Sequence, residues 1–539
     1  MENLKTDRRI ILFSLPLIML FCGCFSVIAG KDLSWDIANY HFYNPYAFLH
    51  HRFNWDIWPS TFICIYINPT IDFLTYFLIQ HFSASFAEFI LGALHGINYW
   101  LLFLIARLFL SDKLKNALAI PITLLGLYGP FSLLGIGSFQ NDNTISIFIL
   151  GFVYLYLRAL NRYAKNHTLS WALFFFSGLL LGIGTGLKYI ATLFIIGGLF
   201  ATAILPIAYR KRVQLIAWLM GAITLGIFIS AGYWMLLMWK QHHNPLFPFF
   251  NQLFQSPDYA SINWRDTRYL PRNLTQFLIY PFYFSWDGSI ADVPFRDFRF
   301  LTVYVLFLLG GIHWCWKKIC HTPTQLDISI IWIYAFFISS YIVWQSYFSI
   351  ARYIVSLEML SPLIIYLLIR QILSHYYTRA IILIVIFSSL FFLMTPGRIF
   401  RLPINNASYF NVQLPPVVKR TKGAIVLLPY PSFVQAGNPA PLTYLIPFFP
   451  DKWHFIGIPF ARGKFNLNWI REEKILALLK NSNSPVFLLT TTKSKLELYR
   501  AVHKWQLHTS GPCEIVRSDR QDLLEETIWL CPVRAGDST

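Results

Sequence analysis

Charged residues are scarce in this chain. Only 13% of its 539 residues are Asp, Glu, Lys or Arg, whereas 56% are hydrophobic. A soluble globular domain carries roughly a quarter of its residues as charged side chains, so this deficit excludes an ordinary soluble fold. Aromatic residues alone reach 18%, a share that suits lipid-facing helices and interfacial belts. The composition therefore predicts a polytopic membrane protein.

Other common signatures are missing too. The sequence shows no fixed-period repeat and no low-complexity tract. Its seven cysteines have none of the spacings of a zinc site. Two of them, Cys513 and Cys531, fall near candidate strands of the tail. They would pair in an oxidising compartment if the geometry allows, or else remain free thiols.

Acidic residues are scarcer than basic ones. The chain has 26 Asp and Glu and 44 Lys and Arg, which gives a net charge of +18. Such a balance can indicate nucleic-acid binding. Here, however, the basic residues form short clusters between apolar stretches, at Arg8-Arg9, Lys113 with Lys115, 158–165, 210–212, Lys317-Lys318 and 370–379. This is the distribution of cytoplasmic loops under the positive-inside rule, so no nucleic-acid partner is expected.

About eleven apolar stretches approach the roughly 20 residues that a bilayer requires. They are residues 10–30, 86–110, 117–137, 143–160, 171–187, 189–209, 214–239, 300–316, 328–348, 352–370 and 379–396. Residues 60–82 are apolar as well, but Asn68-Pro69 and Asp72 interrupt them. This favours an interfacial or re-entrant helix, with a full span as the alternative. The first stretch is interpreted as a retained anchor rather than a signal peptide because of its length.

The positions of the basic clusters predict how these spans are oriented in an inner (plasma) membrane. With a cytoplasmic N-terminus, every cluster lies inside, and the outer segments are 31–85, 138–142, the turns near 187 and 350, 240–299 and everything after 397. If residues 60–82 formed a true span, every later loop would change sides and Asp36 would be separated from the other outer acids and cations.

The tail differs in character from the rest of the chain. Residues 423–428, 485–490 and 528–531 read as strands, and residues 468–480 and 495–505 as amphipathic helices. This alternation predicts a small soluble α/β domain over 397–539, outside the cytoplasm, after a helical membrane domain over 1–396.

Ionisable side chains gather on the predicted outer face. Such groups at a membrane boundary are costly to desolvate, so a cluster of them indicates a functional role. The first loop holds Asp36, Asn39 and His41, the next holds Asp142, later turns hold Lys188 and Arg352, and the long loop holds Arg265, Arg268, Trp286 and Asp287.

Each of these residues also has a simpler interpretation. Asp36 and Asp142 would serve as helix caps, while Lys188 and Arg352 would snorkel from helix ends. The glycine run at 182, 184 and 186 indicates close helix packing rather than a phosphate cradle, because no Rossmann unit surrounds it. Their shared location on one face, with cations opposite acids, favours a site.

This layout resembles that of the GT-C glycosyltransferases, which have an acid in the first outer loop, a second acid in the next, about a dozen spans and a soluble outer domain. Residues 36–41 (DIANYH) look like the D-x-x-x-Y-H motif of that family. The GLKY segment around Lys188 and the sequence Ala351-Arg352-Tyr353, followed by Pro362, are similar to two further family segments. The match around Asp142 departs from the pattern, because Asn141-Asp142-Asn143 stands where other members carry a pair of acids.

The resemblance implies sugar transfer, with inversion, from a polyprenyl-phosphate donor to a hydroxyl of a lipid, glycan or protein acceptor. In this scheme Asp36 is the base, His41 orients Asp36 or touches the phosphate, and Asp142 assists the acceptor or binds an optional divalent metal. Lys188, Arg352 and Tyr353 would bind the donor phosphate. A loop with Trp286, Asp287, Arg265 and Arg268 would lie over the substrate, its aromatic rings serving as sugar platforms or as an interfacial belt.

Two other functions remain open. A transporter or flippase of lipid-linked sugars would use mid-membrane charge and repeated halves, yet Glu88 and Glu358 are the main acids in or near spans. An O-antigen ligase or polymerase would depend on arginines and a histidine of a long outer loop, such as Arg265, Arg268 and His242 or His243.

Overall fold

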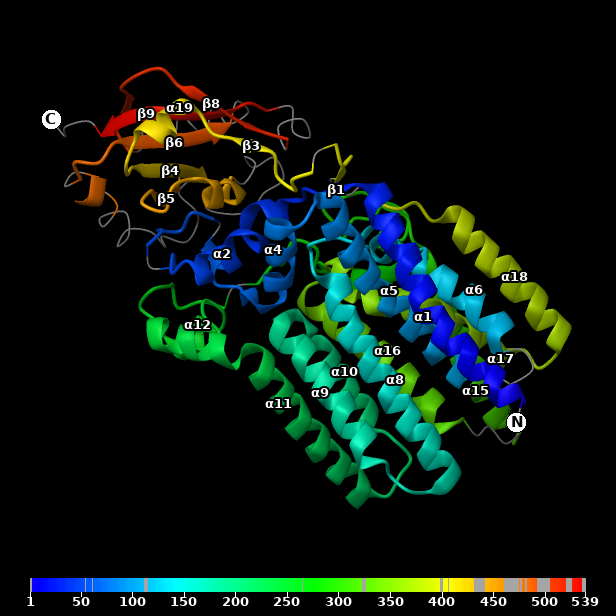
Figure 1. Ribbon diagram of the computed structural model, residues 1–539. Coiled ribbons are helices and arrows are strands. Elements are labelled where there is room, and N and C mark those ends of the chain that lie inside the picture. Colours follow the sequence, from blue (N-terminus) through cyan, green and yellow to red (C-terminus); the bar gives the residue numbers. More distant parts are fainter. Residues whose placement is uncertain are drawn as a thin grey trace. The chain divides into compact units, whose positions relative to one another are not determined.

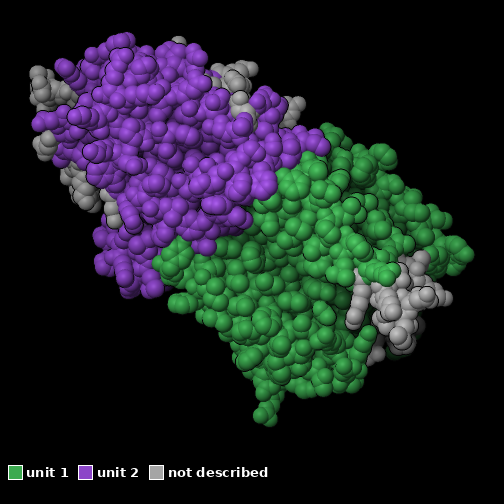
Figure 2. All heavy atoms as spheres, viewed as in Figure 1, with its two compact units in different colours: residues 1–26, 89–233, 265–399 green, residues 27–88, 234–264, 400–539 purple. Residues whose placement is uncertain are grey.

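The structure is a computed structural model that describes residues 2–53, 55–60, 62–110, 115–263, 265–321, 326–397, 401–405, 407–430, 442–459, 475, 477–479, 482–491, 505–519 and 526–535. The chain divides into two compact units (Figure 2). Unit 1 comprises residues 1–26, 89–233 and 265–399, and unit 2 comprises 27–88, 234–264 and 400–539. This division differs from the expected boundary at residue 396, because the first outer loop groups with the tail.

Unit 1 consists of apolar helices (Figure 1). They are α1 (Glu2–Ala29), α5 (Ala84–Leu108), α6 (Lys115–Leu127), α7 (Pro130–Leu134), α8 (Asp142–Asn166), α9 (Trp171–Leu187), α10 (Thr192–Ala203), α11 (Tyr209–His242), α13 (Leu274–Leu278), α14 (Tyr280–Phe284), α15 (Arg299–Ile319), α16 (Ile328–Tyr347), α17 (Val355–Ile372) and α18 (Tyr376–Leu393). The 3₁₀ turns η3 (Tyr189–Ala191) and η4 (Ala351–Ile354) precede α10 and α17. The ends of α1, α5 and α11 are counted with unit 2.

Eight helices among the described residues are long and apolar enough to cross a membrane, namely α1, α5, α8, α11, α15, α16, α17 with its preceding turn, and α18. The other three predicted stretches form shorter apolar helices of 10–17 residues, α6, α9 and α10 with its preceding turn. The expectation of a multi-pass membrane protein is therefore confirmed at the level of eight candidate spans.

Residues 60–82 do not form one helix. They divide into α3 (Phe62–Ile65), the 3₁₀ turn η2 (Pro69–Ile71) and the ten-residue α4 (Asp72–His81). Asn68 begins η2, and its side-chain oxygen accepts the Thr70 amide at 3.1 Å. No piece approaches the ~20 residues of a span, so the interpretation as one spanning helix is not supported.

The helices of unit 1 differ sharply in burial. The central α17 is buried along almost its whole length, whereas α1, α15 and α18 expose most of their side chains. Most of those exposed side chains are apolar, as expected for helices that face lipid. In the same unit α8 packs on α9, α10 on α16 and α15 on α17.

Glycines bring α9 and α11 close together. A Cβ atom on Gly182 would overlap the carbonyl oxygen of Ile223, and one on Gly226 would overlap that of Leu179. On Gly186 it would collide with the hydroxyl of Ser230. The interpretation of this glycine run as close helix packing is confirmed.

Unit 2 contains a seven-stranded mixed sheet with the order β3-β8-β9-β6-β4-β5, in which β7 also pairs with β9. The predicted strands appear as β4 (Ile425–Tyr430), β6 (Val486–Thr491) and β9 (Ile528–Ala535), joined by β3 (Val412–Gln413), β5 (His454–Pro459), β7 (Leu507–Thr509) and β8 (Glu514–Ser518). The three strands β5, β4 and β6 are parallel, and β9 is antiparallel to β6. Most of the two predicted tail helices, 468–480 and 495–505, lies outside the described residues.

The first outer loop is part of unit 2. It contains β1 (Lys31–Asp32), paired with β2 (Arg401–Leu402), then the π-helical turn η1 (Ile37–His41) and α2 (Tyr43–Leu49). The remaining short elements are α12 (Asn251–Phe254), α19 (Pro416–Arg420) and the 3₁₀ helix η5 (Thr443–Phe448).

This loop is bonded to β5, the last strand of the sheet. Ile57 forms a parallel bridge with Ile456, and the Asp56 carboxylate accepts the Phe455 amide at 2.9 Å. Arg52 binds Asp56 through two hydrogen bonds of 2.7 and 2.8 Å and also donates to the main-chain carbonyls of Asp451 and Trp453, just before β5. The loop and the sheet therefore form one packed body.

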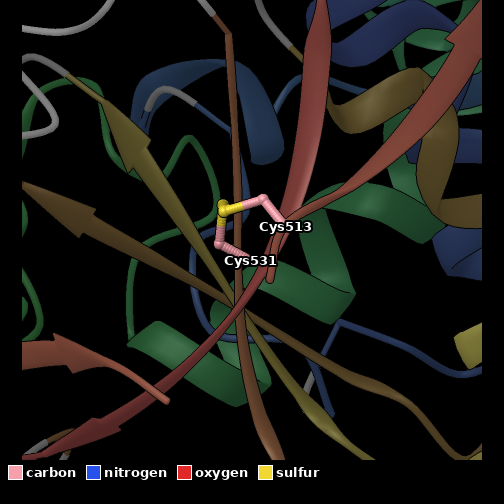
Figure 3. Close-up of a disulfide and its surroundings, with 2 residues drawn as sticks. All are labelled: Cys513 and Cys531. Carbon is pink, nitrogen blue, oxygen red and sulfur yellow. A yellow bond between two sulfur atoms is a disulfide. The ribbon is translucent and has the colours of Figure 1, made fainter. Parts of the chain in front are cut away.

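A disulfide joins Cys513 to Cys531 (Figure 3). Cys531 lies in β9, and Cys513 lies directly before β8, its antiparallel neighbour. The possibility that these two residues pair is confirmed.

Candidate functional site

Two cations and a carboxylate meet in unit 1. Asp142 is the first residue of α8 and follows Asn141, which has a left-handed backbone with φ of 65°. Lys188 follows the last residue of α9, and Arg352 lies in the 3₁₀ turn before α17. We call Asp142, Lys188, Arg352 and Tyr353 the cationic cluster.

The contacts within the cationic cluster are short. The Lys188 ammonium donates to Asp142 Oδ1 at 2.5 Å and to the Gln140 carbonyl at 2.8 Å. The Arg352 guanidinium lies 3.8 Å from Asp142 Oδ2. Each cation is also 5.6 Å from the centre of the Tyr353 ring, so the aromatic face is shared by both charges.

The electrostatics of the cluster favour an anion. Two positive side chains, Lys188 and Arg352, face the carboxylate of Asp142, so cations are concentrated at this point of the unit. The amino-terminal end of the 25-residue α8 adds a partial positive charge at the same place. The side chains of Lys188 and Arg352 retain 19% and 23% of their exposure, so the cluster is accessible to a ligand. These features suit a phosphate group, to which the Arg352 guanidinium would bind through two hydrogen bonds and the Lys188 ammonium through a single charged group.

The first outer loop forms a second polar group, in unit 2. Asp36 accepts a hydrogen bond from Tyr40 at 3.1 Å, and the His41 Nδ1 atom lies 2.9 Å from Asp72 Oδ2. Asn39 accepts the Ser60 hydroxyl at 2.6 Å. Asp36, His41 and Asp72 are all buried, with the Tyr40 ring 4.1 Å from that of His41.

Asp72 is the residue of this group that sequence reasoning missed. It appeared only as an interruption of an apolar stretch, yet it begins α4 and pairs with His41 across 31 positions. An isolated acid in an otherwise apolar run was the available signal, because burying it requires a partner.

The helix-cap interpretations account for little of this geometry. Asp36 stands before η1 in a helical conformation, and its side chain forms no capping hydrogen bond. Asp142 is inside α8, and its carboxylate faces the two cations. Lys188 likewise points at a carboxylate and a carbonyl of its own unit.

The predicted residues of the long loop have contacts within unit 1. Arg268 is bound to Asp266 and, at 2.9 Å, to Asp292. Arg265 lies over the Tyr347 ring at 5.1 Å. The Asp287 carboxylate accepts the Ser289 amide of its own turn.

Trp286, in the same loop, is 61% exposed and is covered on one face by the Arg296 guanidinium at 4.9 Å. Within unit 1 the loop does join the cationic cluster at one point. The Ala351 amide, next to Arg352, donates to the Ile290 carbonyl at 3.0 Å.

The two acids near spans are structurally bound. In unit 1, Glu358 accepts the amide of Ser132 at 2.8 Å and lies 3.4 Å from the buried Arg299, which Asp297 also binds. In unit 2, Glu88 accepts the Tyr409 hydroxyl at 2.6 Å and pairs with Arg401. These hydrogen bonds and ion pairs give both acids a structural role within their own units. Such a role does not favour the ion-carrying groups expected of a transporter.

The histidine proposed for a ligase or polymerase is also engaged. His242 Nδ1 lies 2.7 Å from Asp258, and its ring stacks on Phe247 at 4.1 Å. These contacts give His242 a packing role in unit 2.

No group of three or more His, Cys, Asp and Glu side chains that could hold a metal ion occurs in the part of the chain that the structure describes. Comparison with protein-family models, curated proteins and solved structures finds no match to this chain. Its function must therefore be argued from its own residues.

Proposed function

We propose that this protein is a membrane glycosyltransferase that moves a sugar from a polyprenyl-phosphate donor to an acceptor hydroxyl on the extracytoplasmic face. The observation that carries the proposal is the convergence of Lys188 and Arg352 on one carboxylate and one aromatic ring at helix ends of the apolar unit. A lipid-linked donor presents its phosphate at the membrane boundary, where such helix ends lie.

The chemistry requires two kinds of group. The acceptor oxygen loses its proton to a base and forms a bond to the anomeric carbon, whose bond to the phosphate oxygen breaks. The polyprenyl phosphate leaves with the electron pair of that bond. Lys188 and Arg352 stabilise the departing phosphate, and Asp36 is the proposed base, with its carboxylate oriented by Tyr40.

The remaining assignments follow from the same scheme. Asp142 neutralises one cation of the cluster before the donor binds and is free to orient the acceptor once phosphate takes its place. His41, held by Asp72, supports the first loop around Asp36. The spans number about eleven, with α6, α9 and α10 counted, the N-terminus is cytoplasmic, and the disulfide-bonded tail is extracytoplasmic.

The test is donor binding and sugar transfer by purified variants. Lys188→Ala and Arg352→Ala should each weaken binding of a polyprenyl-phosphate sugar by about 10- to 100-fold, because a hydrogen bond to a charged group contributes about 1.5–3 kcal/mol. Arg210→Ala removes an exposed arginine of α11 outside the cluster and should change nothing. Donor affinity equal to wild type in both cluster variants would contradict the phosphate assignment.

The base is tested separately. Asp36→Asn should keep donor binding and lose transfer by at least about 100-fold, as expected for removal of a general base. The readout is radiolabelled product formed from polyprenyl-phosphate sugars and a membrane extract. Undiminished transfer by Asp36→Asn would exclude Asp36 as the base without affecting the phosphate site.

A further inference from the structure

An exposed apolar stripe follows the two short helices α13 and α14. Its four side chains recur at every fourth position, and each is half or more exposed: Leu274 at 73%, Leu278 at 56%, Phe282 at 50% and Trp286 at 61%. Ile279 and Tyr283 widen the stripe at 44% and 53%. A concentration of exposed apolar side chains of this kind marks a surface that meets another apolar phase.

The opposite face of α14 packs against α16 within the same unit, whereas α13 buries none of its side chains. Tyr280 and Phe284 are buried, and their rings lie 6.3 and 6.2 Å from that of Trp344 on α16. α14 is thus held in place by one face, while the side chains of the stripe are exposed.

The pair lies where two candidate spans end. The Gln345 side chain, near the end of α16, donates to the Phe277 carbonyl of α13. After α14, the Ser285 carbonyl accepts the Asp297 amide, two residues before α15 begins. The stripe is therefore next to the ends of these two helices, and the ring of Phe282 lies 6.0 Å from that of Tyr304 on α15.

The polar surroundings match a lipid interface. Arg272 is exposed beside α13, and Arg296 covers one face of Trp286. Tryptophan and tyrosine prefer this depth of a bilayer, and arginine reaches the phosphates of head groups from it. A lipid surface explains why the stripe lies at the ends of two spans, whereas binding of a protein partner does not.

We infer that residues 274–286 form a membrane-anchoring elbow, whose stripe inserts among the acyl chains of the leaflet at the carboxyl end of α16. In the proposed orientation this is the outer leaflet. The elbow does not depend on the proposed transferase activity. It does bear on it, because the same loop is hydrogen-bonded through Ile290 to Ala351, so that anchoring restrains the turn that carries Arg352.

The experiment measures collision of a nitroxide with oxygen, which concentrates in acyl chains, and with a water-soluble nickel chelate. The label is placed at Leu278→Cys, with Phe282→Cys as a second position, in a chain whose five free cysteines, Cys22, Cys24, Cys64, Cys315 and Cys320, are replaced by alanine. The matched control is Asp292→Cys, on a side chain of the same loop that is 64% exposed. The protein is reconstituted in phosphatidylcholine vesicles.

We expect labels at 278 and 282 to collide several-fold more with oxygen than with the nickel chelate, and the label at 292 to show the reverse. If the labels at 278 and 282 match the control, the stripe lies in water and the inference is wrong. Low collision with both reagents at 278 and 282 would mean that protein, a second copy or another chain, covers the stripe, and it too would overturn the inference.

Discussion

At the scale of single residues, this chain places its few acids beside cations, hydrogen-bond donors or histidines. Asp142, Asp72 and Asp56 each face a basic side chain at 3 Å or less. Breaking a buried pair costs about 3–5 kcal/mol, because it leaves one group without compensation. In these three pairs a scarce acid is matched by a basic partner.

The pair of His41 and Asp72 makes a prediction about coupling. Asp72→Asn and His41→Gln should each lower the free energy of unfolding by about 3 kcal/mol or more. The double variant should lose at least about 1 kcal/mol less than the sum, because the second change removes a partner that is already unpaired. Thermal or denaturant unfolding in detergent gives the values. Additive losses would show that the two side chains do not stabilise each other.

His454 on β5 makes a prediction about pH. Burial lowers the pKa of His454 below its usual value of 6.5. Below pH 6.5 the unfolded chain binds a proton that the folded chain resists, so this contribution to stability is present above 6.5 and is lost as pH falls. When the pH is lowered from 7.5 to 5.5, the free energy of unfolding of His454→Gln should therefore fall by about 1 kcal/mol less than that of wild type.

The control for this prediction is the exposed His508→Gln on β7 of the same sheet. Melting temperatures at the two pH values, measured for wild type and both variants, provide the comparison. A decline of His454→Gln as steep as that of wild type would remove His454 as the source of acid sensitivity.

At the scale of elements, hydropathy predicted where the helices lie, and a proline with its preceding residue predicted one helix boundary. Each predicted span overlaps an apolar helix, although 117–137 divides into α6 and α7, because a bilayer-length apolar run has few alternatives to helical structure. Asn68-Pro69 also marked the break within 60–82 correctly, since proline is favoured at the first position of a helical turn and lacks the amide that would continue a preceding helix.

The pairings between elements were less predictable. Counting spans placed Asp142, Lys188 and Arg352 on one side of the membrane, but sidedness alone does not bring three helix ends within a few ångströms. Asp72 could not be matched to His41, nor Asp56 to the Phe455 amide, because such contacts depend on three-dimensional packing across 31 and 399 positions. The same holds for Arg268, whose partner Asp292 lies 24 residues away.

The contact of α9 with α11 makes a prediction about helix packing. Gly182→Leu should destabilise the protein by about 2–3 kcal/mol or prevent its accumulation, because the side chain has no space against Ile223. Gly221→Leu is the matched control, since a Cβ there meets nothing within 4 Å. Folded yield and melting temperature in detergent decide the outcome. Equal behaviour of the two variants would contradict close packing at Gly182.

At the scale of the whole molecule, two bodies of different character share one chain. Unit 1 is a set of apolar helices around α17, and unit 2 is a sheet joined to the first outer loop. Segments from three separate parts of the sequence build each unit. Composition predicted both characters, but it could not predict that the loop bearing Asp36 folds with the tail.

The disulfide makes a prediction about compartment. In protein isolated from cells, Cys513 and Cys531 should react with a maleimide only after reduction, whereas the exposed Cys320 should react at once. Cys513→Ser should free the thiol of Cys531 and lower stability by about 3 kcal/mol, as expected for closing a loop of this length. Mass spectrometry of labelled peptides gives the readout. Labelling of both residues without reduction would place the tail in a reducing compartment.

The bridge between Ile57 and Ile456 has a practical consequence for anyone who studies the tail alone. β5 ends the sheet, and the first loop occupies the hydrogen-bonding groups along part of that strand. A fragment beginning near residue 401 would leave this row of amides and carbonyls bare, and bare strands recruit other chains into aggregates. A soluble version of the tail would need a peptide spanning residues 52–57 fused or added to it.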